Sequence, residues 1–144
     1  MWITMKLFNG KFEMALRVML ILDELGKATE NDILTLDLVA TYGKSFGLSK
    51  NNLHGDNQFN FSEIATRKQM IRAGIAYLRL YELVKQIPNL SHGYEYELTK
   101  AGKKIIEEVN DDYSYEYQRI LQKASTNRER LFTRVRQHLM KKLR

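Results

Sequence analysis

Three histidines are the residues best suited to catalysis or metal binding, but their surroundings support neither: they are His54, His92 and His138. Only His54 has an acid close by, Asp56, and together the two supply at most two of the three or four ligands that zinc requires. The neighbouring Gly55 and Asn57 favour a turn instead. A metal-dependent enzyme built on this loop is therefore kept only as an alternative.

Nucleophilic catalysis has no better support in the sequence. The chain has no cysteine, which excludes thiol nucleophiles, disulfides and zinc fingers. No serine lies in a Gly-x-Ser-x-Gly motif, and no glycine-rich phosphate loop follows an expected strand. Neighbouring carboxylates occur only where helix ends or exposed faces are expected: Asp23-Glu24, Glu107-Glu108 and Asp111-Asp112. We therefore expect a binding protein with no cofactor, metal or catalytic residue.

A basic stripe is the clearest candidate for binding. Lys68, Arg72 and Arg79 are separated by four and seven residues, so on a helix they lie within about 40° of one another. Arg67 flanks the stripe. Such a stripe suits the phosphates of DNA or an acidic protein surface.

Two features weigh against sequence-specific DNA recognition. Glu95 and Glu97 occupy the expected exposed positions of a strand nearby, where acid would repel phosphates. The helix also lacks the Asn- and Gln-rich first turn that suits base recognition. The sequence therefore favours protein binding over the reading of a DNA sequence.

The C-terminal segment is strongly basic. Residues 119–144 hold nine bases and one acid, a net charge of +8, so the whole-chain charge of +6 leaves −2 for residues 1–118. Its candidate contacts with DNA or an acidic partner are Arg128, Arg130, Arg134, Arg136, Lys141 and Lys142. A helical apolar stripe could dock on a partner: Phe132, Val135, Leu139 and Leu143. The alternative is a solvated basic helix.

The basic stripe belongs to an expected helix that starts at Ser62 and ends before Pro88, because proline cannot continue a helix. A hairpin is expected over about 85–98, since Tyr94, Tyr96 and Leu98 alternate with acids. Thr99 then caps another helix. This order of helix, hairpin and helix is typical of a winged helix.

The rest of the chain reads as helical. An apolar helix over 12–25 ends at Gly26, Thr29 and Asp32 form a capping box for the next helix, and 44–61 reads as a loop. We expect a mainly α fold with a small β-hairpin: a winged helix-turn-helix domain over 1–112, then a C-terminal helical extension over 113–144.

Some residues allow two interpretations. Asp37 lies within an apolar helix, where it is either buried and paired or part of a narrow solvent-facing strip. The tyrosines of the C-terminal extension face either a partner or the core: Tyr113, Tyr115 and Tyr117.

The length of 144 residues suits one domain with a real core. The apolar run over 18–22 is too short to span a membrane, and no signal-peptide cleavage site accompanies it. We therefore expect a cytoplasmic protein.

Several motifs resemble the small middle component of ABC-three-component conflict systems, the group that includes Lamassu-type bacterial defence. The resemblance covers roughly residues 8–110. It rests on these segments: Lys11–Arg17, Ile33–Asp37 with Tyr42-Gly43, Asn52–Asn57, Phe61–Glu63, Arg67 and Tyr94–Gly102.

The resemblance implies a winged-helix accessory subunit that acts beside an SMC/Rad50-like ABC ATPase and an effector, often a nuclease, in defence against phage or plasmids. It implies no catalytic residue in this chain. The alternative is a stand-alone winged-helix transcription regulator that forms a homodimer and binds an operator.

Overall fold

The computed structural model describes residues 11–41, 63–110 and 112–126, which form five helices and one three-stranded antiparallel sheet. In chain order the elements are α1 (Lys11–Leu25), β1 (Lys27–Thr29), α2 (Glu30–Thr41), α3 (Glu63–Leu80), β2 (Val84–Asn89), β3 (Gly93–Leu98), α4 (Lys100–Glu108) and α5 (Asp112–Thr126). The expected mainly helical fold with a small hairpin is confirmed. No described helix combines the length and hydrophobicity that a membrane crossing requires.

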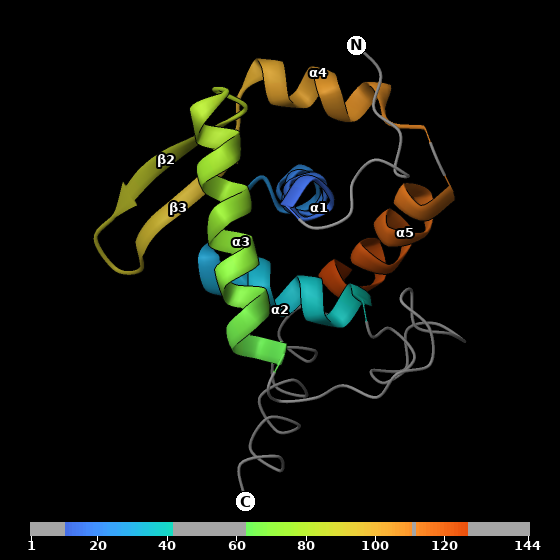
Figure 1. Cartoon of the computed structure of the whole chain (residues 1–144), viewed down its shortest axis with the longest axis horizontal. Helices are drawn as coiled ribbons and strands as arrows, with labels where there is room; N and C mark the ends of the chain where they lie inside the picture. The colour runs from blue at the N-terminus through green and yellow to red at the C-terminus, as the bar shows by residue number, and fades with distance from the viewer. Residues whose placement is uncertain (1–10, 42–62, 111, 127–144) are drawn as a thin grey trace, which may run out of the picture.

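Helix α1 forms the centre of the fold. Figure 1 looks along its axis, with α2, α3, α4 and α5 arranged around it. It contacts all four of these helices and the sheet, and every residue from Met14 to Leu22 is buried. Because apolar residues cover nearly its whole circumference, α1 is stable only when other elements surround it.

The start of α2 is fixed by the predicted capping box. The Asp32 backbone N–H donates to Thr29 Oγ1 at 3.1 Å, and the Thr29 backbone N–H donates to Asp32 Oδ2 at 3.3 Å. This reciprocal pair satisfies two N–H groups that have no partner within the helix. Residues Lys27–Thr29, just before it, form the short strand β1, which the sequence analysis did not predict.

Helix α3 is followed by strand β2. It stops at Leu80, before Pro88 as expected, and the segment leading to Pro88 forms strand β2, close to the expected start of the hairpin at about residue 85. The chain turns at Glu82, which has a positive φ of 58°, and the Leu83 N–H donates to the Leu78 carbonyl at 2.8 Å. Proline is tolerated in β2 because β2 is an edge strand.

Strand β3 lies in the middle of the sheet, between β1 and β2. Ala28 pairs with Tyr96 on one side, and Gln86 pairs with the same residue on the other. The hairpin turn is held by Asn89 Oδ1, which accepts from the backbone N–H groups of Ser91 and His92 at 2.8 and 3.0 Å. The predicted hairpin therefore has a third strand beside it.

Helices α4 and α5 complete the packing around α1. Thr99 caps α4 as predicted, with Oγ1 accepting from the Gly102 N–H at 3.1 Å. Helix α5 packs against α1 and α2 through a buried stripe of Tyr117, Ile120, Leu121 and Ala124. Tyr117 therefore faces the core, whereas Tyr115 is exposed.

Candidate functional site

The basic stripe of α3 has the predicted positions, with one departure. Arg72 and Arg79 are exposed and Lys68 is half-buried, so these three residues present positive charge along one side of α3. Arg67 turns inward instead, and only 12% of its side chain is exposed. On α3, the surface available to DNA or an acidic partner is therefore formed by Lys68, Arg72 and Arg79.

Arg67 belongs to a buried polar cluster that joins four helices. Its guanidinium lies 2.6 Å from Oδ2 of Asp37 and donates to the Thr41 hydroxyl at 3.3 Å. Oδ1 of the same carboxylate accepts from the Tyr117 hydroxyl at 2.6 Å and lies 3.4 Å from Nε of Arg17. Of the two interpretations of Asp37, the buried and paired one is confirmed.

The cluster keeps Asp37 ionised despite its complete burial. Burial alone would raise the pKa of this carboxyl, but the charges of Arg17 and Arg67, and the hydrogen bonds from Tyr117 and Arg67, outweigh it and hold the pKa below its ordinary value. The contacts of this one carboxylate connect residues of α1, α2, α3 and α5 inside the core. The cluster therefore links these four helices in the core behind the basic stripe.

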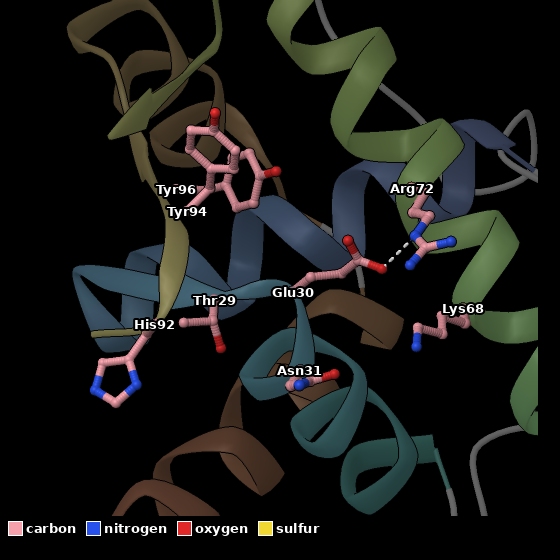
Figure 2. Close-up of a pocket in the computed structure, with 8 residues that line it drawn as sticks. All are labelled: Thr29, Glu30, Asn31, Lys68, Arg72, His92, Tyr94 and Tyr96. Carbon is pink, nitrogen blue, oxygen red and sulfur yellow. Dashed lines mark hydrogen bonds and ion pairs between the residues drawn. The ribbon is translucent and has the colours of Figure 1, made fainter. Parts of the chain in front are cut away.

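In front of the stripe, the surface forms a hollow of about 250 Å³. Figure 2 shows the side chains around it: Lys68 and Arg72 from α3, Glu30 from the first turn of α2, and His92, Tyr94 and Tyr96 from the hairpin. Arg72 Nε lies 2.5 Å from Glu30 Oε1, although 60% of the Arg72 side chain remains exposed. The hollow therefore combines two cations, one acid, one imidazole and two tyrosine rings.

The two faces of the hairpin differ in chemistry. Because successive side chains of a strand point to opposite faces, Tyr94 and Tyr96 line the hollow while Glu95 and Glu97 lie on the other face. There Lys85 Nζ lies 2.9 Å from Glu97, and this hydrogen bond is the main reason that the pKa of Glu97 is lowered. Glu95 accepts a hydrogen bond from Asn89. The acidic residues that argued against DNA binding therefore do not face the hollow.

Tyr96 of β3 is influenced by charged groups on α2 and α3. Burial raises the pKa of its hydroxyl, and the charge of Glu30 raises it further, while Arg79 and Arg72 partly counteract them. The hydroxyl therefore stays protonated at neutral pH and retains a hydrogen to donate.

The sequence analysis found the cations of the hollow but missed its acid. Glu30 precedes Arg72 by 42 residues, and no local pattern connects them. The His54–Asn57 loop and the candidate contacts of the C-terminal tail lie outside the described residues; the tail residues are Arg128, Arg130, Arg134, Arg136, Lys141, Lys142, Phe132, Val135, Leu139 and Leu143. Within the described segments, no three His, Asp or Glu side chains are grouped so that they could hold a metal ion.

A protein-family model matches nearly the whole chain. The model describes the ABC-three component system Middle Component 2, and the match spans residues 7–143. Searches of curated proteins and of solved structures found no significant match. The chain thus belongs to the Middle Component 2 family, which makes it a middle component of an ABC-three-component defence system.

Proposed function

We propose that the segment from α1 to β3 is a winged-helix unit, with α3 as its recognition helix and the β2–β3 hairpin as its wing. The order helix, short strand, helix, helix and hairpin supports this assignment, as does the pairing of β1 with β3. Because α3 lies beside the hairpin, its exposed basic side occupies the position at which winged-helix units bind a partner.

The chain then acts as a non-catalytic, cytoplasmic subunit of a Lamassu-type defence complex directed against phage or plasmids. It bridges or regulates an SMC/Rad50-like ABC ATPase and an effector nuclease through protein contacts. The observation that carries this proposal is the family match over residues 7–143, because a middle component is by definition one of several subunits.

An exposed aromatic patch offers a surface for such a protein contact. The rings of Phe12 and Tyr77 meet edge to face at 5.2 Å, and Tyr77 and Tyr81 lie 4.8 Å apart. Tyr81 is 58% exposed, and Leu80, which precedes it in the chain, is 76% exposed. Aromatic side chains that group on a surface are typical of the core of a protein interface. We assign this patch to a subunit of the complex.

The basic stripe supports a second, non-specific contact with double-stranded DNA held by the complex. Lys68, Arg72 and Arg79 lie on α3, and the face of the hairpin beside them carries tyrosines rather than acids. Cations placed in this way neutralise phosphates without reading the base sequence.

Co-purification from the native operon, followed by size-exclusion chromatography, tests the proposed assembly. We expect a large SMC-like ATPase to co-elute with this subunit. Leu80→Glu with Tyr81→Glu should abolish co-elution, whereas Tyr115→Glu, an equally exposed tyrosine on α5, should not. Charge reversal of Lys68, Arg72 and Arg79 should reduce DNA binding by the complex.

The stand-alone transcription regulator remains the second candidate, and the placement of Glu95 and Glu97 away from the hollow favours it. It requires a homodimer that shifts an operator duplex without any other subunit. A lone dimer with that behaviour would contradict the accessory-subunit proposal.

A further inference from the structure

The two cations of the hollow, both on α3, differ in their pairing with the acid Glu30 of α2. One of its two cations, Arg72, already has an acidic partner in Glu30, yet 60% of its side chain is exposed. The other, Lys68, comes from the same side of α3 and lies one helical turn away. An anion that enters the hollow would therefore meet one cation directly and a second that Glu30 holds.

We propose that the hollow binds a phosphate of the DNA backbone, and that the carboxylate of Glu30 competes with this phosphate for Arg72. This inference rests on the proposed DNA contact and deepens it, because it names the site and the residue that limits its affinity. Lys68 and Arg72 hold the phosphate, and Tyr94 supplies a surface for the adjoining sugar or base.

Exchange of Glu30 for a phosphate is chemically simple. The guanidinium of arginine binds carboxylate and phosphate oxygens with the same planar set of donors. An exposed ion pair contributes little to stability, so DNA, which brings many phosphates at once, can displace Glu30. No backbone rearrangement is needed, since Arg72 is already exposed.

The tyrosines favour a nucleic acid over a simple anion as the occupant. Tyr94 is 53% exposed at the edge of the hollow, where its ring can pack against a sugar or base. Tyr96, which is 9% exposed beside Tyr94, lines the same hollow, and its hydroxyl can donate a hydrogen bond to a phosphate oxygen. The volume of about 250 Å³ leaves room for a phosphate with its sugar.

As a consequence, the carboxylate of Glu30 lowers the affinity of the free subunit for DNA. Glu30 neutralises one of the cations that the basic stripe presents, and binding must first break that pair. Removal of the carboxylate should therefore strengthen binding more than removal of an equal negative charge elsewhere.

The test compares Glu30→Gln with Glu97→Gln in the full-length chain, using a 20-base-pair duplex and fluorescence anisotropy. Both substitutions remove one acid that pairs with a cation, but Glu97 and its partner Lys85 lie on the opposite face of the hairpin. We expect Glu30→Gln to bind the duplex about 1.5- to 5-fold more tightly than Glu97→Gln, the range expected for an exposed ion pair. Thermal unfolding of both variants confirms that each is folded.

The same comparison in an Arg72→Gln background isolates the competition. There the difference between the two acid substitutions should shrink, because Glu30 no longer pairs with Arg72. Arg72→Gln itself should lower the slope of log K against log salt concentration by about 0.9, the contribution of one phosphate contact. Arg119→Gln should not, although Arg119 is equally exposed and also paired with an acid, Glu116.

Three results would overturn the inference. If Glu30→Gln and Glu97→Gln bind the duplex equally, Glu30 is no competitor, while loss of binding in the Lys68, Arg72 and Arg79 charge reversal would still uphold the proposed DNA contact. If neither wild type nor Glu30→Gln binds DNA, both ideas fail. If these substitutions change only co-elution with the ATPase, the hollow holds an acidic protein segment instead.

Discussion

A hydrogen bond of 2.6 Å joins the hydroxyl of Tyr117 to Oδ1 of Asp37, although the two residues lie 80 positions apart in the chain. It connects α5 with α2 inside the core, where neither residue is exposed. The other oxygen of the same carboxylate binds Arg67 of α3. The helix that carries the basic stripe and the helix that leads to the basic tail are thus linked through one buried carboxylate.

Tyr117→Phe should lower the free energy of unfolding by about 1.5–3 kcal/mol, since it removes a hydrogen bond to a buried charged group and keeps the ring. Urea unfolding at neutral pH measures this change. Tyr115→Phe is the matched control, because its hydroxyl binds Asn110 on the surface, and it should change stability by less than about 0.5 kcal/mol. Equal losses in the two variants would contradict a special role for the Tyr117 bond.

The stability of the protein should fall in acid as Asp37 takes up a proton. Its folded pKa lies below the ordinary value of 3.8, so at pH values between the two the unfolded chain binds more protons than the folded one. The stabilisation is therefore complete above pH 3.8 and is lost as the pH falls through the folded pKa. Urea unfolding at intervals below pH 4.5 measures the loss.

Glu24 should act in the opposite direction and at higher pH. Burial, with repulsion from Asp23, raises its folded pKa above 4.5, so protonation near that value favours the folded state. In Glu24→Gln this opposing contribution disappears, and the fall in stability on acidification should begin without a preceding rise. An unchanged pH profile in Glu24→Gln would show that its carboxylate has the same affinity for protons in both states.

The sequence predicted those parts of the fold that depend on neighbouring residues. The capping box of Thr29 and Asp32 and the cap at Thr99 each involve partners three positions apart. The exact stop of α3 at Leu80 escaped prediction because the turn uses a positive φ at Glu82 rather than at a glycine. Strand β1 is too short to show alternation, and only its pairing with β3 identifies it.

For the candidate site, too, the sequence predicted features within one helix but not contacts between distant residues. The side of α3 that carries Lys68, Arg72 and Arg79 follows from helical periodicity. The inward turn of Arg67 does not, because it depends on Asp37, which lies 30 residues earlier. The pairing of Arg72 with Glu30 likewise joins two different helices, α3 and α2, across 42 residues of sequence. A single sequence contains no signal for such contacts between distant residues.

Gly102→Ala should destabilise the fold, whereas Gly74→Ala should not. A Cβ at Gly102 would overlap the backbone carbonyl of Leu83, which cannot move without disturbing its bond to Thr99. A Cβ at Gly74 would make ordinary contacts of 3.4 Å or more with α1. We expect a loss of about 1–3 kcal/mol for Gly102→Ala and a gain of up to about 1 kcal/mol for Gly74→Ala. Thermal and urea unfolding distinguish them, and a stable Gly102→Ala would show that Leu83 can shift.

Arg67 and Arg79 are both arginines of α3, and their substitution should have separate consequences. Arg67→Met removes one partner of the buried Asp37 and should lower the free energy of unfolding by about 3 kcal/mol. Arg79→Met removes an exposed cation and should leave stability within about 0.5 kcal/mol of wild type. In DNA-binding assays at a temperature where both variants are folded, Arg79→Met should weaken binding and lower its salt dependence. If Arg67→Met weakened binding equally while remaining as stable as wild type, Arg67 would have to leave the cluster and reach DNA directly.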